Sequence, residues 1–94
     1  AFVGATGVSQ DGRCSSQNSI EAQLKRRAIA SAATSVILAD ATKIGRNAFS
    51  EFSTMSEIDI LITDAAADMT TVAAFRQEGL DVIVAEALPP EHNS

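Results

Sequence analysis

A lysine in a short polar loop is the residue of this sequence most suited to binding an anion. Lys43 follows the apolar run 36–39 and lies in the segment 40–46, Asp-Ala-Thr-Lys-Ile-Gly-Arg. In parallel α/β sheets, ligands bind beyond the carboxyl ends of the strands, and a lysine ammonium placed there can contact a phosphate. Asp40 opens the same loop and is the second candidate in it. The alternative is that Lys43 is an ordinary solvated lysine, which is the commoner situation.

A glycine-flanked turn at residues 4–7 is a further candidate for ligand contact. Gly4 and Gly7 allow the backbone to approach a ligand closely or to turn tightly, and Thr6 between them supplies a hydroxyl. A single short glycine pair is a weak signal, so a plain turn remains the alternative. We expect this turn and Lys43 to meet at one end of a sheet, because both follow strands that we infer to be parallel and adjacent.

Charged residues also begin a predicted helix. Asn18 suits the N-cap position, and Glu21 lies three residues later, where its charge favours the helix start. Lys25 follows one turn further on, beside two arginines. Glu21 and Lys25 are therefore candidates for ligand contact. In the alternative interpretation, Glu21 serves only as a cap and Lys25 belongs to a solvated helix face.

The elements that position these residues alternate along the chain. Apolar runs without alternation, typical of strands covered on both faces, predict strands at residues 2–5, 36–39, 59–63 and 80–85. Helices are predicted at 18–34 and 69–78, loop at 8–17, an irregular segment or short strand at 46–55, and a helical turn at 56–57. This order predicts an α/β fold with a parallel sheet and right-handed crossovers.

The predicted helices have assignable caps and buried sides. In the first helix, a stripe is predicted to face the core. It runs through Ile20, Leu24 and Ala28 and is widened by Ile29, Ala32 and Ala33. The second is predicted to begin after Asp68 and to end at Gly79. Its predicted buried residues are Val72, Ala73, Ala74 and Phe75.

Composition excludes several classes of protein. The 94 residues suffice for one small domain, and the net charge of −5 argues against a nucleic-acid surface in this chain. The single cysteine, Cys14, cannot form an internal disulfide, which fits a reducing cytosol. Because no histidine lies near it to activate it, Cys14 is interpreted as a loop or core residue. No apolar run approaches the roughly 20 residues that a membrane span needs.

No motif predicts catalysis, a metal site or a cofactor. The sequence lacks a cysteine–histidine cluster, a serine–histidine pair, a phosphate loop and a dinucleotide fingerprint. His92 lies in a polar tail after two prolines, and residues 89–94 are predicted to be disordered. The chain starts without methionine inside the predicted strand 2–5, so we expect it to be a fragment that lacks an N-terminal part. Its domain is expected to span residues 1–88.

Four segments, taken in order, carry a resemblance to a known family. They are FVGATGV at 2–8, EAQLKR at 21–26, LADATKIGR at 38–46 and IDILITD at 58–64. With these spacings the chain, from Phe2 to about Val84, resembles the C-terminal effector domain of DeoR-type bacterial transcription repressors. The four motifs together are far more specific than any one alone.

This resemblance implies a function as well as a fold. The fold would be a partial domain similar to ribose-5-phosphate isomerase, with a Rossmann-like parallel sheet and helices packed on it. Such a domain senses a phosphorylated sugar or related metabolite and so modulates operator binding by an N-terminal winged helix-turn-helix, which this chain lacks. The effector-binding residues would be Gly4, Thr6, Gly7, Glu21, Lys25, Asp40 and Lys43. The protein would be cytoplasmic, would have no membrane partner, and would form a homo-oligomer.

Two other functions compete with the sensor. A sugar-phosphate isomerase of similar fold uses a carboxylate pair after the first strand, a lysine in the next loop and a helix glutamate. Here Thr6 stands where the sensor family itself usually has aspartate, the loop 9–17 has no lysine, and Lys25 occupies the place of the glutamate. Proton transfer between sugar carbons needs a positioned base, so we predict a sensor and not an enzyme. A phospho-accepting receiver using Asp40 is less favoured, because receivers cluster acidic residues after the first strand.

Overall fold

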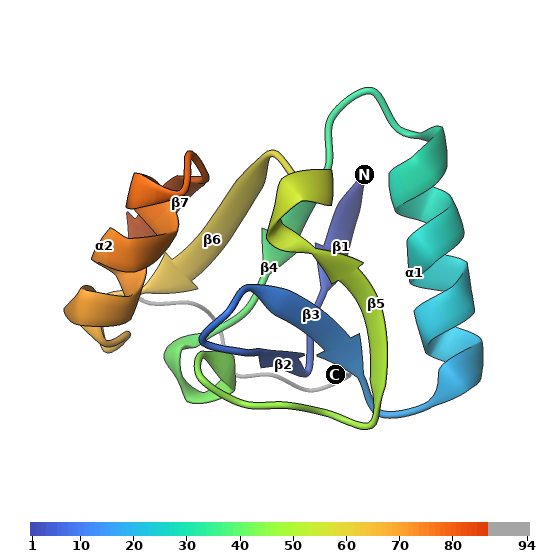
Figure 1. Ribbon diagram of the computed structural model, residues 1–94, viewed down its shortest axis with the longest axis horizontal. Coiled ribbons are helices and arrows are strands. Elements are labelled where there is room, and N and C mark those ends of the chain that lie inside the picture. Colours follow the sequence, from blue (N-terminus) through green and yellow to red (C-terminus); the bar gives the residue numbers. More distant parts are fainter. Residues whose placement is uncertain (87–94) are drawn as a thin grey trace.

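Four parallel strands form the main sheet of the computed structural model, which describes residues 1–86 (Figure 1). They are β1 (Phe2–Gly4), β4 (Val36–Leu38), β6 (Ile60–Asp64) and β7 (Asp81–Ala85), side by side in the order β1-β4-β6-β7. The predicted α/β class with a parallel sheet is confirmed. The predicted tail at 89–94, with His92, lies outside the described residues.

A second, antiparallel sheet was not predicted. It consists of β2 (Gly7–Val8), β3 (Arg13–Ser16) and β5 (Ser50–Thr54), in the order β2-β3-β5. The loop expected at 8–17 is therefore wrong, whereas the short-strand alternative within 46–55 is confirmed. The β2–β3 turn closes through Gly12, whose φ of 86° is one that other residues rarely adopt.

Helix α1 (Ser19–Ser31) begins as predicted, but only part of the predicted stripe, including Ile29, is buried. The Asn18 side chain caps it by accepting a hydrogen bond from the Glu21 backbone N–H at 2.9 Å. Its buried residues are Ala22 and Ile29, and the helix lies against β5 and β3. Two members of the predicted stripe are instead exposed, Ile20 at 71% and Leu24 at 63%.

Helix α2 (Met69–Gln77) has the predicted cap and stop. The Asp68 carboxylate accepts from the backbone N–H and hydroxyl of Thr71, and Gly79 follows the helix with a φ of 97°. Its buried residues are Thr71, Val72 and Phe75, whereas the predicted Ala73 and Ala74 are exposed. Two 3-10 turns, η1 (Ala41–Lys43) and η2 (Met55–Glu57), complete the described elements, and η2 confirms the helical turn expected at 56–57.

One face of the parallel sheet is fully buried, and the other is only partly covered. Val3, Ile37, Leu61 and Val82, which lie in register across the four strands, are all buried. On the opposite face Phe2 is 74% exposed and Ile83 48%. The strand order advances in one direction, and right-handed crossovers then all lie on one side. Burial on both faces, expected for the run 36–39, is confirmed at Ile37 on one face and at Val36 on the other. At the edge strands the second face is exposed.

Among residues 1–86, no helix is both long enough and apolar enough to cross a membrane.

Candidate functional site

The carboxyl ends of β1 and β4 bring the two predicted loops together at one end of the sheet (Figure 1). The Ala5 N–H donates to the Leu38 carbonyl at 3.1 Å, which holds the two chains together where the strands end. Further on, Val8 forms a parallel bridge to Ile44, and the Gly45 N–H donates to the Val8 carbonyl at 2.6 Å. The Gly4–Gly7 turn and the loop that carries Lys43 therefore run side by side.

Asp40 and Lys43 form an ion pair within the η1 turn. The Lys43 Nζ lies 3.7 Å from the Asp40 Oδ2, and the side chain of Lys43 is only 14% exposed. Asp40 caps η1, because its Oδ1 accepts from the backbone N–H of Thr42 at 2.9 Å and from the Thr42 hydroxyl. The Thr42 hydroxyl is the main cause that lowers the pKa of Asp40, with help from the Thr42 N–H and the Lys43 charge. A charged carboxylate and a charged lysine are thus held in a short, ordered turn.

Asp64 at the end of β6 anchors this turn, a role that was not predicted from the sequence. Its Oδ2 accepts from the Ala41 N–H at 3.0 Å, and its Oδ1 accepts from the Ala66 N–H at 2.9 Å. One carboxylate therefore ties the η1 turn after β4 to the segment that leads into α2. The polar Thr63-Asp64 step at the end of an apolar run was the available signal, but the identity of its partner depended on the fold.

Two buried hydroxyls at the same end of the sheet have no hydrogen-bond partner among residues 1–86. They belong to Thr6, which follows β1, and to Thr63 in β6, which is fully buried. Leaving a buried donor unpaired costs about 1–3 kcal/mol, so such groups are uncommon in folded proteins. The Thr6 hydroxyl therefore has unused hydrogen-bonding capacity just after β1, although the oxygen itself is buried.

Glu21 and Lys25 form a separate cluster at the start of α1. The Lys25 Nζ donates to the Ser16 Oγ at 2.8 Å, lies 3.7 Å from the Glu21 Oε1 and sits 5.4 Å above the Phe52 ring. Because its partners are within the protein, Lys25 is packed against β3 and β5 and is not the solvated helix lysine of the alternative interpretation. No hydrogen bond or ion pair within residues 1–86 joins this cluster to Lys43.

The two glycines of the β1–β2 turn differ in the space that a side chain would have. A Cβ on Gly7 would fall 2.7 Å from the Arg46 carbonyl oxygen and 3.0 Å from the Ala48 nitrogen. Gly7 is therefore required for packing of the 46–48 backbone on the hairpin. Gly4 is exposed, and a Cβ there would meet only the Leu38 carbonyl at 4.0 Å.

The structure identifies neither a reactive thiol nor a metal site in the part of the chain that it describes. Cys14 is 1% exposed, and burial raises the pKa of its thiol to about 11, which leaves almost no thiolate at neutral pH. No group of three His, Cys, Asp or Glu side chains among residues 1–86 could hold a metal ion.

Comparison with known proteins shows a family match and several curated relatives. The family model described as the DeoR C terminal sensor domain matches residues 1–65. The chain is 30% identical over 82 residues to the HTH-type transcriptional regulator GlpR of Haloferax volcanii, an alignment that covers 87% of this chain and 32% of the relative. It is 29% identical over 86 residues to the HTH-type transcriptional repressor GlcR of Bacillus subtilis, covering 92% and 33%. The chain thus spans about a third of the length of these relatives.

Proposed function

The chain belongs to the family of DeoR C-terminal sensor domains, and on that premise we propose that it binds a phosphorylated sugar or related metabolite at the carboxyl end of its parallel sheet. The observation that carries this proposal is the meeting of the Lys43 loop and the Gly4–Gly7 turn at that end. The Lys43 ammonium, held by Asp40, and the buried, unpaired Thr6 hydroxyl both follow adjacent parallel strands, at the end of the sheet where ligands of parallel α/β sheets bind.

The proposed contacts follow from the chemistry of each group. The Lys43 ammonium pairs with the phosphate, because a charge-assisted hydrogen bond to phosphate is stronger than a neutral one. The Thr6 hydroxyl and the Asp40 carboxylate suit sugar hydroxyls, which both donate and accept. Gly4 is proposed to leave the turn open to the ligand, because an added Cβ there would meet only the Leu38 carbonyl. Gly7 is proposed to act by holding the turn against the backbone of residues 46–48. Glu21 and Lys25, at the start of α1, are proposed to lie at the edge of the sugar site. Lys25 contacts Ser16, and the neighbouring Ser15 pairs with Gly7 of the turn.

In a longer protein, such binding would regulate transcription. The curated relatives are named as HTH-type transcriptional regulators and span about three times the length of this chain. We propose that effector binding here modulates operator binding by a helix-turn-helix module outside this chain, in the cytoplasm. The proposed domain covers residues 1–88. Isomerase activity is the alternative, and it is disfavoured because Thr6 and Lys25 stand where that chemistry needs carboxylates.

The test of this function is binding without turnover. Calorimetry with a panel of hexose and pentose phosphates should show at least one ligand that binds while its unphosphorylated counterpart does not. The same ligands should be recovered unchanged after incubation. Conversion of any phosphosugar to an isomer would favour the enzyme, and equal binding of phosphorylated and plain sugars would contradict the phosphate site.

This chain by itself is not expected to bind operator DNA. Duplex affinity depends on neutralising phosphates with Lys and Arg, whereas this chain carries a net charge of −5. In a mobility-shift assay at physiological salt, the chain should leave labelled duplex unshifted. A shift that weakens as salt increases would overturn this expectation.

We further propose that the chain associates with itself, most simply as a two-fold dimer. Among residues 1–86, strand β1 pairs with β4 and with no other strand, so its second edge can pair with another chain. Phe2 in this strand is exposed. Light scattering over a concentration series should show a mass above that of the monomer. A monomer mass that persists into the high micromolar range would contradict this proposal.

A further inference from the structure

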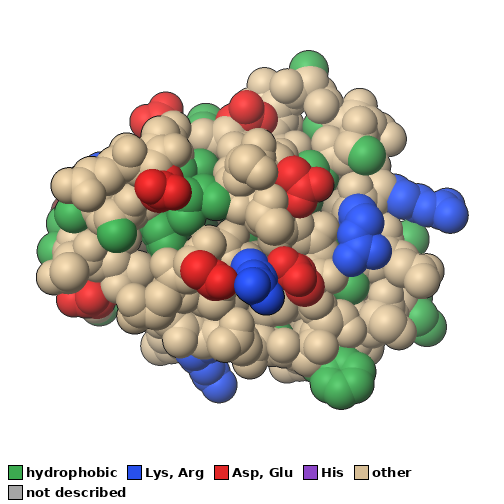
Figure 2. All heavy atoms as spheres, in the orientation of Figure 1, with side chains coloured by type: hydrophobic (Ala, Val, Ile, Leu, Met, Phe, Trp, Pro, Cys, Tyr) green, Lys and Arg blue, Asp and Glu red, His purple; other side chains and the backbone are tan. Residues whose placement is uncertain are grey.

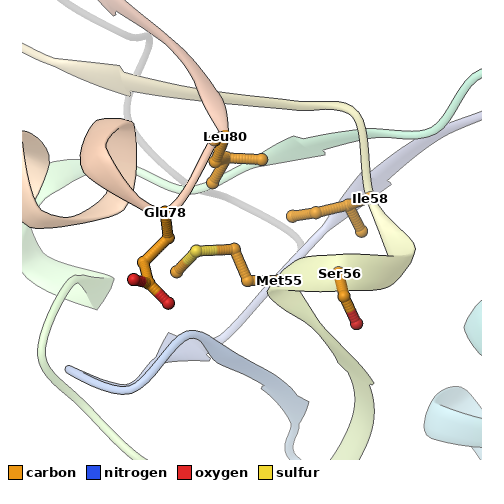
Figure 3. Close-up of a pocket in the computed structure, with 6 residues that line it drawn as sticks. Met55, Ser56, Ile58, Glu78 and Leu80 are labelled. Carbon is orange, nitrogen blue, oxygen red and sulfur yellow. The ribbon is translucent and has the colours of Figure 1, made fainter.

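A pocket opens at the end of the sheet opposite to the η1 turn (Figure 3). Its volume is about 300 Å³, at the lower end of the range of small-molecule sites. It lies between η2, which precedes β6, and the turn from α2 into β7. Its lining residues are Met55, Ser56, Ile58, Glu78, Gly79 and Leu80.

The floor of the pocket is apolar and held in place by its surroundings. Ile58 and Leu80 are 8% and 7% exposed, and Met55 faces them across the hollow (Figure 3). The tip of the β2–β3 hairpin packs closely against Met55. A Cβ added to Gly12 would fall 2.4 Å from the Met55 Cε. At Gly79, by contrast, an added Cβ would meet nothing within 4 Å, so that side of the pocket is open.

The rim of the pocket is negative. Glu78 follows the last turn of α2, where the carbonyl end of the helix carries partial negative charge. Within residues 1–86, no ion pair involves its carboxylate, which points along the pocket beside Met55 (Figure 3). The segments 55–60 and 78–81 together contain four carboxylates and no lysine or arginine. Two of the four, Glu57 and Asp59, accept hydrogen bonds from the backbone N–H groups of Thr54 and Ser35. Figure 2 shows acidic side chains around an apolar hollow on this face.

We propose that this pocket binds a small organic cation, an alkylammonium or alkylguanidinium. Its alkyl stem would lie against Met55, Ile58 and Leu80, and its charged head would face Glu78. The apolar floor would bind the alkyl stem, because burying its methylene groups is favourable. The unpaired carboxylate and the helix end account for the positive head. The negative rim would repel a phosphorylated ligand. The cation site is therefore separate from the proposed effector site, and either proposal can fail without the other.

The test is an amide NMR titration of the chain with protonated n-butylamine. Two matched probes separate the contributions: n-butanol keeps the stem without the charge, and methylammonium keeps the charge without the stem. We expect n-butylamine to shift the amides of residues 55–58 and 78–80, and each matched probe to bind more weakly. Equal responses to n-butylamine and n-butanol, or largest shifts elsewhere, would overturn the proposal.

A charge variant tests the role assigned to Glu78. Glu78→Gln keeps the shape of an exposed side chain, and we expect it to weaken n-butylamine binding about two- to five-fold, the size of a well-formed exposed ion pair. Glu51→Gln, a partly exposed glutamate of β5 outside the pocket, is the control and should leave affinity unchanged. The same affinity for Glu78→Gln and for the unmodified chain would overturn the proposed contact.

Discussion

The two ends of the parallel sheet both carry carboxylates but differ in how those carboxylates are used. At the carboxyl end, Asp40 and Asp64 each accept hydrogen bonds from backbone N–H groups. At the amino end, Glu57 and Asp59 also accept from the backbone N–H groups of Thr54 and Ser35. Among residues 1–86 no hydrogen bond to a backbone N–H is made there by the carboxylates of Glu78 and Asp81, and these two set the contrast. The number of acidic residues at a site therefore does not determine whether the site binds an anion or a cation. Where backbone donors already balance the carboxylates, a nearby lysine can attract an anion, and where they do not, the surface favours a cation.

Removing the Asp64 carboxylate should have the largest effect on this contrast. Asp64→Ala leaves the Ala41 and Ala66 N–H groups unpaired and releases the η1 turn, so we expect a loss of about 3 kcal/mol in the free energy of unfolding. Urea denaturation followed by circular dichroism measures it. Asp81→Ala at the other end is the control and should change stability by less than about 0.5 kcal/mol. Similar losses in both variants would remove the distinction between the two ends.

Replacing Lys43 should mainly affect ligand binding. Lys43→Ala is expected to weaken binding of a phosphosugar about 20-fold, because one charge-assisted hydrogen bond to phosphate is lost. Arg27→Ala, an exposed arginine on α1, is a better control than Arg76→Ala, since Arg76 donates to the Val82 carbonyl at 2.8 Å. Calorimetry compares phosphosugar binding by the unmodified chain, Lys43→Ala and Arg27→Ala. Equal affinities for the Lys43 and Arg27 variants would contradict the proposed phosphate contact.

The smallest predicted effect concerns the pH dependence of the η1 turn. The pKa of Asp40 is lowered in the folded protein, so its contribution to stability is present above the ordinary value of 3.8 and is lost as pH falls through the folded value. Thr42→Val removes the hydroxyl that is the main cause, so the pKa of Asp40 should rise toward 3.8. A carboxyl NMR titration measures this change, with Thr70→Val as the control. An unchanged pKa of Asp40 in Thr42→Val would show that the hydroxyl is not the cause.

Local signals in the sequence predicted much of this fold. Apolar runs located the four parallel strands, and Asn18 and Asp68 were recognised as helix caps because capping depends on neighbours within one turn. The meeting of the 4–7 turn with the Lys43 loop followed from the parallel arrangement alone.

The missed features depend on partners that are distant in the sequence. Strand β3 is rich in serine and has no apolar alternation, so only its pairing with β5 reveals it. The inward side of α1 includes Lys25, whose ammonium lies over the Phe52 ring and donates to Ser16. An apolar periodicity cannot reveal such a contact. The anchoring role of Asp64 and the pocket at Glu78 likewise arise only where separate segments meet.

The central claim is that a phosphorylated ligand binds at the carboxyl end of the sheet, and an amide NMR titration with phosphosugars tests it most directly. We predict that the bound phosphosugar shifts the amides of residues 4–7 and 40–46 and leaves those of 55–58 and 78–80 unchanged. Largest shifts at 55–58 and 78–80, or the same shifts with the unphosphorylated sugar, would contradict it.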